Sequence, residues 1–175
     1  KRDGGWDKLP PSDWLINSAG YTDVDGAESH REIAFAVNGD GAGRVAAWCS
    51  ARNTRLIHIS TDYVFDGASG HPYRENDPVT PLSRYGESKL AGERAVAGSC
   101  RQHIIVRTQS LFGMHGRNFV RGIMGRLAAG GQIKVVTDQV SAPTYTVHLA
   151  QAILRLLDTG REGIVNISAS GSCSW

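Results

Sequence analysis

Short runs rich in β-branched residues alternate along the chain with longer segments in which apolar residues recur every three or four positions. The short runs predict strands, and the longer segments predict helices. The predicted strands are residues 14–17, 56–60, 103–106, 133–136 and 164–167, and the predicted helices are about 27–51, 85–97, 118–129 and 146–157. This alternation is typical of βαβ units, so the sequence predicts an α/β protein with a parallel sheet.

Two of the predicted helices carry features that bear on packing. In the first helix, six apolar residues are spaced to share one stripe: Ile33, Ala34, Val37, Val45, Trp48 and Cys49. Residues 39–43 (GDGAG) lie inside this helical pattern and lack the G-x-G-x-x-G spacing, which favours close helix packing or a kink over a phosphate loop. In the helix predicted at 85–97, Lys89, Glu93 and Arg94 fall on the polar side.

Composition and charge narrow the class of protein. The 175 residues are 41% hydrophobic and 21% charged, which is usual for a globular protein. A formal net charge of +2 gives no basic field of the kind that nucleic-acid binding needs. No apolar run is long enough to span a membrane, and the start at residues 1–5 leads into no signal peptide. We therefore expect a cytoplasmic protein with neither nucleic acid nor membrane as a partner.

Several residues have types or positions that could indicate a metal site, a disulfide or a helix cap. The three cysteines and six histidines have neither disulfide nor zinc spacing, so the sequence predicts no metal site. Asp23 and Asp25 follow a turn and are interpreted as caps of the helix that begins near Ala27.

The chain starts at Lys1 and stops soon after its last predicted strand. We therefore expect a piece of a longer protein, in which a site built from several segments is partly absent.

A tyrosine and a lysine open the helix predicted at 85–97. In residues 85–89 (YGESK), i, i+4 spacing puts the phenol and the ammonium on one helix face. The strand predicted at 56–60 leads directly into Thr61, and open parallel sheets bind ligands at their strand ends. A carbonyl that accepts hydride needs a proton donor and an orienting donor, roles that suit Tyr85 and Thr61, while Lys89 would lower the Tyr85 pKa. The alternative is that all three residues are structural or solvated.

Six segments match the motifs of one known group of proteins. They are residues 17–25 (NSAGYTDVD), 60–67 (STDYVFDG), 85–93 (YGESKLAGE), 116–120 (GRNFV), 138–144 (DQVSAPT) and 171–175 (GSCSW). In these segments the chain resembles the extended short-chain dehydrogenase/reductases and, within them, the dTDP-4-dehydrorhamnose reductase family. The resemblance runs in the right order from Trp14 onward.

The resemblance implies a Rossmann-like doubly wound parallel sheet, incomplete here, with part of a smaller substrate domain. Residues 1–113 would be the C-terminal portion of the NAD(P)-binding domain, and 114–175 the start of the sugar-nucleotide domain, interleaved with the last sheet strands. The implied activity is reduction of the 4-keto group of dTDP-4-dehydro-L-rhamnose to dTDP-L-rhamnose with NADPH or NADH. A dTDP-sugar would be the partner, and a homodimer stays open.

The resemblance also assigns roles to individual residues. The catalytic set would be Thr61, Tyr85 and Lys89. The cofactor would lie along Ala19, Gly20, Tyr21 and Thr22 and touch Tyr85 and Lys89. The sugar would face Thr61, Asp62, Tyr63 and Ser110. Sugar-nucleotide dehydratases carry a glutamate where Tyr63 stands, so the sequence favours reduction over dehydration.

Two departures from the family pattern leave alternatives open. The glycine-rich dinucleotide loop is missing from this chain, so the sequence does not decide between NADH and NADPH. Ser110 stands where the family has an aromatic residue, which leaves open a different sugar. The alternatives are another deoxysugar-nucleotide ketoreductase or epimerase of the same superfamily, and a non-catalytic dinucleotide-binding regulatory subunit.

Overall fold

The computed structural model describes residues 8–116, 118–130 and 132–174. The start of the chain lies outside the described residues, as do Arg117 and Trp175 from two of the matched motifs. Within the described residues, no helix combines the length and the apolar character needed to cross a membrane.

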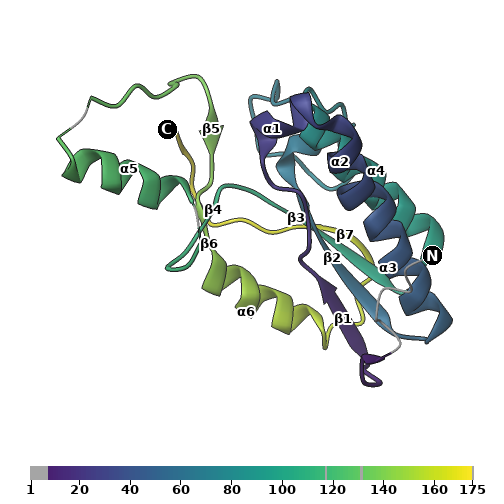
Figure 1. The fold of residues 1–175 in the computed structure, drawn as a ribbon. Helices are drawn as coiled ribbons and strands as arrows, with labels where there is room; N and C mark the ends of the chain where they lie inside the picture. Colours follow the sequence, from purple (N-terminus) through teal and green to yellow (C-terminus); the bar gives the residue numbers. More distant parts are fainter. Residues whose placement is uncertain (1–7, 117, 131, 175) are drawn as a thin grey trace.

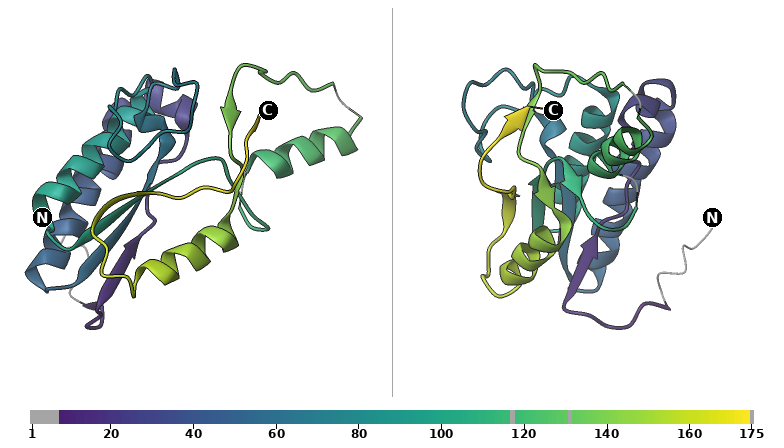
Figure 2. Two further views of the ribbon diagram at one scale, coloured as in Figure 1. Left: turned by 180° about the vertical axis from the view of Figure 1, so that it is seen from behind. Right: turned by 90° about the vertical axis from the view of Figure 1, so that its left-hand side faces the viewer.

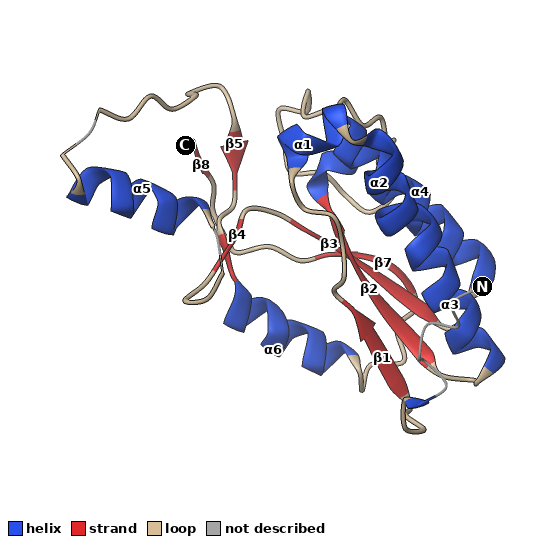
Figure 3. Cartoon of the chain, in the orientation of Figure 1, coloured by secondary structure: helices blue, strands red, loops and turns tan. Residues whose placement is uncertain are grey.

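A four-stranded parallel sheet forms the centre of the fold (Figures 1 and 3). Its strands, in spatial order, are β1 (Trp14–Asn17), β2 (Arg55–Thr61), β3 (His103–Thr108) and β7 (Gly163–Asn166). The register pairs Asn17 with His58, and Thr61 with Thr108. Four of the five predicted strands are therefore confirmed, and the carboxyl ends of β1, β2 and β3 meet at one edge of the sheet.

Helices cover both faces of the sheet (Figures 1 and 2). One face carries α1 (Val24–Ser29), α2 (Arg31–Phe35), the π-helical η2 (Ala36–Gly41), α3 (Ala42–Ala51) and α4 (Arg84–Ser99), and the other carries α6 (Thr146–Leu156). Because both faces are covered, consecutive residues of β2 are buried on opposite sides, Leu56 against α3 and α4 and Ile57 against α6. This arrangement confirms the predicted Rossmann-like α/β fold.

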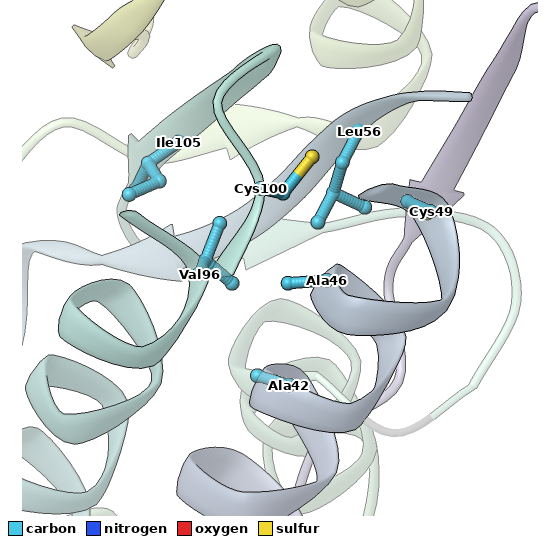
Figure 4. Packing of buried hydrophobic residues seen from close by; sticks show 7 residues of the cluster. All are labelled: Ala42, Ala46, Cys49, Leu56, Val96, Cys100 and Ile105. Atoms are coloured by element: carbon cyan, nitrogen blue, oxygen red, sulfur yellow. The ribbon is translucent and has the colours of Figure 1, made fainter. Parts of the chain in front are cut away.

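The core between the sheet, α3 and α4 is built from small and branched side chains (Figure 4). Its buried members are Ala42, Ala46, Cys49, Leu56, Val96, Cys100 and Ile105. Small residues on α3 let this helix approach the sheet and α4 closely, which burial of the whole cluster requires.

The first helical region differs from the single helix predicted at 27–51. It begins at Val24, is interrupted at His30 and contains a π-helical turn at 36–41. The Asp23 carboxylate accepts a 3.0 Å hydrogen bond from the Gly26 amide, which confirms this residue as the cap. Ile33 and Val37 are exposed rather than part of the buried stripe, because a π-helical turn holds more residues and changes which side chains face the sheet.

The glycine cluster at 39–43 packs against α4, which confirms the preferred interpretation. A Cβ built on Gly43 would lie 3.1 Å from the Cβ of Ala95, and one on Gly39 would lie 3.5 Å from the Cβ of Ala91. On the facing helix, a Cβ on Gly92 would come within 2.2 Å of the Asn38 carbonyl oxygen. Glycine on both helices thus permits their backbones to approach.

The polar side predicted for α4 is wrong at two positions. Arg94 is exposed as expected, but Lys89 and Glu93 are 5% and 3% exposed and point into the protein. Hydrophobic periodicity missed this because both buried charges are compensated by polar partners that lie far away in sequence.

The remaining short elements gather beside the sheet, where α5 (Phe119–Ala128) projects outward (Figure 1). Two small sheets form there: β4 (Leu111–Phe112) runs parallel to β6 (Thr144–Tyr145), and β5 (Val140–Ser141) runs antiparallel to β8 (Cys173–Ser174). The strand predicted at 133–136 is wrong. This segment pairs with no described strand, and Val135 and Val136 remain 43% and 51% exposed.

Candidate active site

Thr61 ends β2 at the carboxyl edge of the sheet, and its side chain is fixed by the turn that follows. The residue is 5% exposed. Its hydroxyl accepts a 3.3 Å hydrogen bond from the Tyr63 amide and donates at 3.1 Å to the Asp62 carboxylate. The threonine thereby caps the short 3₁₀ helix η3 (Asp62–Val64), which holds the hydroxyl at one position.

Tyr85 lies in the first turn of α4, directly against η3. Ser83 caps this helix by accepting a 3.1 Å hydrogen bond from the Gly86 amide. The ring of Tyr85 meets that of Tyr63 edge to face, with centroids 5.6 Å apart. Gly86 makes this approach possible, because a Cβ there would lie 2.2 Å from the Tyr63 carbonyl oxygen. The fold therefore brings Thr61, Tyr63 and Tyr85 together, as the sequence predicts.

The Tyr85 pKa is raised, which is opposite to the lowering by Lys89 expected from the sequence. Burial is the largest cause; a hydrogen bond with Thr61 opposes the rise, and the nearby Asp62 and Tyr63 add to it. Burial raises the pKa because the phenolate is the charged form, and a low dielectric penalises it. Tyr85 is consequently a neutral hydrogen-bond donor at neutral pH.

Lys89 is a buried cation one turn further along α4. Its Nζ donates a 2.6 Å hydrogen bond to the carbonyl oxygen of Ile59 in β2. Burial lowers the Lys89 pKa to about 8, and the charge of Glu93 opposes this shift. A Cβ built on Gly20 would lie 3.9 Å from Nζ, so the ammonium sits beneath the turn that follows β1.

Asp62 is the acidic group of the site. Burial raises its pKa to about 6, while hydrogen bonds from Thr61 and from the backbone of residues 62 and 63 oppose this rise. The carboxyl group therefore titrates close to neutral pH rather than in the usual acidic range.

The turn at residues 19–22 is held from below by two buried asparagines. Asn17 accepts a 3.2 Å hydrogen bond from the Ala19 amide and also hydrogen-bonds to the His58 ring. Asn38 accepts from the Tyr21 amide at 2.8 Å and donates to the Tyr21 carbonyl oxygen at 3.1 Å. These contacts fix the turn beside Lys89, while residues 18–20 are exposed.

Asn38 is a residue that sequence reasoning missed. It is 2% exposed and also donates a 2.9 Å hydrogen bond to Ser88, which joins η2 to α4. Its position in a π-helical turn is what aims the amide at the turn after β1, and hydrophobic periodicity does not reveal such a turn. The only available signal was an asparagine beside the glycine cluster.

Ser110 makes its hydrogen bonds with a different part of the chain from Thr61, Tyr85 and Lys89. It follows β3 with a φ of 45°, a left-handed conformation that is strained for serine. Its hydroxyl donates to Ser141 at 2.9 Å, and its carbonyl accepts from the Thr144 amide at 3.2 Å. These bonds tie the end of β3 to β5 and β6, and they involve none of Thr61, Tyr85 and Lys89.

Among the described residues, no group of three or more histidine, cysteine, aspartate or glutamate side chains is arranged to hold a metal ion. The side chains at the sheet edge are hydroxyl, phenol, ammonium and carboxyl groups, a set suited to hydrogen bonding and proton transfer.

A parallel Rossmann-like sheet with a Tyr-x-x-x-Lys helix packed at its carboxyl edge is the arrangement of the extended short-chain dehydrogenase/reductase class. The chain belongs to the RmlD substrate binding domain family, whose model matches residues 7–175. The family resemblance recognised in the sequence is thereby confirmed.

Individual relatives agree with this membership. A dTDP-4-dehydrorhamnose reductase of Mycobacterium tuberculosis is 48% identical over 159 residues, which cover 87% of this chain and 52% of the relative. A dTDP-4-keto-6-deoxy-D-glucose reductase of Streptomyces niveus is 41% identical, covering 92% of this chain and 56% of the relative. The crystal structure of dTDP-4-dehydrorhamnose reductase from Bacillus anthracis in complex with NADP superposes with a TM-score of 0.93 at 38% identity, covering 97% of this chain and 60% of that one. The chain thus spans little more than half the length of these relatives.

Proposed function

We propose that the protein containing this chain is an NAD(P)H-dependent reductase. It reduces the 4-keto group of dTDP-4-dehydro-L-rhamnose and gives dTDP-L-rhamnose. The observation that carries the proposal is the convergence of Thr61, Tyr85 and Lys89 at the carboxyl end of β2, beside the turn at 19–22. The names of the M. tuberculosis and B. anthracis relatives support this reaction and this class of cofactor.

The residues beside Lys89 fit a dinucleotide. Residues 18–20 are small and exposed, and Gly20 leaves open the space that a side chain would fill above the Lys89 ammonium. In the proposal, Ala19, Gly20, Tyr21 and Thr22 line the cofactor, and Tyr85 and Lys89 contact it. NADPH or NADH, when bound, supplies the hydride that adds to C4 of the sugar.

In the proposal, residues of this chain donate the proton and orient the keto group. Tyr85 donates its phenol proton to the keto oxygen as C4 receives hydride, which gives the alcohol. Thr61 orients that oxygen with its fixed hydroxyl. Lys89 stabilises the phenolate left on Tyr85 until a proton from solvent restores the phenol. Asp62, Tyr63 and Ser110 contact the sugar nucleotide in this proposal.

A second candidate substrate is a different dTDP-4-keto-6-deoxy sugar. The S. niveus relative carries such a name at 41% identity. Ser110 supports this candidate, because a small hydroxyl side chain there leaves more room and different hydrogen bonding than an aromatic ring. The two candidates share Thr61, Tyr85 and Lys89 and differ only in the sugar.

The proposal also assigns the parts of the chain. Residues 1–113 belong to the cofactor-binding domain, and 114–175 begin the sugar-nucleotide domain while returning β7 to the sheet. Both substrates are water-soluble nucleotides, so we assign the reaction to the cytoplasm.

The test uses the product of the complete open reading frame that contains this sequence. The purified protein is mixed with NADPH or NADH and with each dTDP-4-keto-6-deoxy sugar, and cofactor oxidation is followed at its absorbance band while the sugar product is identified by NMR. We expect turnover with dTDP-4-dehydro-L-rhamnose, and Tyr85→Phe should reduce kcat by about 10² to 10⁴ while cofactor affinity is kept. Absence of turnover with every keto sugar would overturn the proposal.

A further inference from the structure

A buried carboxylate lies one helical turn after Lys89 on α4. Glu93 is 3% exposed and receives three hydrogen bonds. Ser60 donates to its Oε1 at 2.6 Å, Arg107 Nε donates to the same atom at 3.0 Å, and Arg107 Nη2 donates to Oε2 at 2.7 Å. All of these donors come from the ends of β2 and β3.

The positions of these donors connect Glu93 to the candidate catalytic residues. Ser60 directly precedes Thr61 in β2, and Arg107 directly precedes Thr108 in β3. On the same helix, Lys89 donates to the Ile59 carbonyl oxygen, next to Ser60. The helix that carries Tyr85 and Lys89 is therefore attached to the end of β2 through two adjacent residues of that strand.

We propose that Glu93 is a positioning residue for the reaction. Its carboxylate sets the distance between α4 and the end of β2, and supplies the negative charge that keeps the Lys89 ammonium in place. The inference rests on the proposed function, and it adds to that function a residue that lies behind the site and touches neither substrate nor cofactor.

Arg107 holds the carboxylate in position. Its guanidinium makes both parallel hydrogen bonds to Glu93, a rigid geometry for a buried pair. The same guanidinium donates at 3.3 Å to the Glu75 carbonyl oxygen and lies 5.0 Å from the centre of the Phe65 ring. The pair thus also anchors the loop between β2 and α4, so Glu93 cannot swing away from the strand ends.

The charges around Lys89 give this arrangement a measurable consequence. His58 faces Lys89 from β2 and is neutral, because burial and the lysine charge lower its pKa to about 3. The turn after β1 and the π-helical η2 place Gly20 and Asn38 near Lys89, and both residues are uncharged. Glu93 is the negative group that raises the pKa of Lys89. Loss of that charge leaves Arg107 uncompensated, and both effects lower the Lys89 pKa further.

The test compares Glu93→Gln with Glu87→Gln in the open-reading-frame product. Glu87 lies on the same helix and pairs with Arg84 at 2.8 Å, but both side chains are partly exposed. We expect Glu93→Gln to lower kcat on the order of tenfold to a hundredfold, because a small displacement of the reacting groups strongly reduces the reaction rate. The alkaline limb of its pH–rate profile should move to lower pH by about one unit or more. Glu87→Gln should match the wild type in both.

A double variant separates positioning from stability. Glu93→Leu with Arg107→Met replaces the buried pair by apolar side chains, a change that often keeps or raises stability. We expect this variant to unfold at a temperature near that of the wild type and yet to show the lowered kcat and the displaced alkaline limb. A stable double variant with wild-type kcat and profile would show that the pair is only structural, and would overturn the proposal.

A direct titration makes the inference independent of activity. Lysine labelled with ¹³C at Cε is titrated by NMR, and the Lys89 signal is identified by its loss in Lys89→Met. The Lys89 pKa should be lower in Glu93→Gln than in wild type and in Glu87→Gln, and equal values in all three would contradict the inference. If the wild type reduces no keto sugar, the proposed function fails, and the titration still decides the link between Glu93 and Lys89.

Discussion

The Lys89 ammonium and the Ile59 carbonyl oxygen are joined by a 2.6 Å hydrogen bond, two residues before the end of β2 at Thr61. A lysine that is 5% exposed is held there against the tendency of its charge to remain in water. The strand carbonyl, the turn above it and the Glu93 carboxylate together keep the charge at the sheet edge. The position is favourable for chemistry and unfavourable for stability.

Lys89→Met should therefore stabilise the protein at neutral pH while abolishing the proposed reductase activity. Burial lowers the Lys89 pKa from 10.5 to about 8, so the charged form is penalised in the folded state. Wild-type stability then rises as pH increases from about 8 toward 10.5, and the advantage of the methionine shrinks over that window. We expect a gain of about 1–3 kcal/mol at neutral pH by denaturant unfolding. A variant less stable than wild type at neutral pH would contradict this.

Asp62→Asn should stabilise the protein at neutral pH but not in acid. Burial raises the Asp62 pKa from 3.8 to about 6, so wild-type stability from this group is fully present below 3.8 and is lost as pH rises through 6. Asparagine keeps an acceptor for Thr61 and carries no charge. The expected gain is at most about 3 kcal/mol above pH 6, measured by unfolding across the pH range.

Asp66→Asn is the matched control for this measurement. Asp66 is exposed, and hydrogen bonds from Tyr73 and from the Ala68 amide lower its pKa. Its contribution to stability therefore has the opposite sign and is lost as pH falls. Stabilisation of Asp66→Asn at neutral pH, or equal stabilisation of Asp62→Asn in acid, would show that burial is not the cause.

Much of the fold follows from local sequence, because buried parallel strands such as 56–60 are short runs rich in Leu and Ile that are bounded by polar turns. The failed strand at 133–136 has the same local pattern but lacks a neighbouring strand among the described residues, and pairing is what local sequence does not encode. The helix at 27–51 was predicted as one piece because a π-helical turn at 36–41 leaves no sign in a 3.6-residue periodicity.

Some residues of the candidate site can be recognised from the sequence, and others only from the fold. Thr61, Tyr85 and Lys89 can be proposed from the sequence, because a strand end and an i, i+4 pair are visible there. Asn38 and Glu93 cannot, because their partners Tyr21 and Arg107 are distant in sequence and become neighbours only in the fold. The direction of the Tyr85 pKa shift was also missed, since it depends on burial rather than on spacing.

Asn38→Ala should weaken both stability and cofactor binding. It removes the acceptor of the Tyr21 amide and the donors to Tyr21 and Ser88, all buried or partly buried. Unsatisfied polar groups and lost bonds together should cost about 2–4 kcal/mol. The loosened turn at 19–22 should raise the Kd for NADPH, measured by fluorescence titration. Ser88→Ala removes one of these partners and should lose about 1 kcal/mol or less; equal effects of the two variants would contradict the role of Asn38.

Substitution by alanine should have opposite effects on stability at two glycines of α4. A Cβ on Gly92 would lie 2.2 Å from the Asn38 carbonyl oxygen, which is backbone and cannot rotate away. Gly92→Ala must therefore push η2 from α4, and we expect a loss of about 2–3 kcal/mol together with a raised Kd for NADPH. Gly98 has open space around a built Cβ, so Gly98→Ala should gain about 0.5–1 kcal/mol through helix propensity. Thermal unfolding of both variants measures these changes. An unchanged stability of Gly92→Ala would contradict the close contact between η2 and α4.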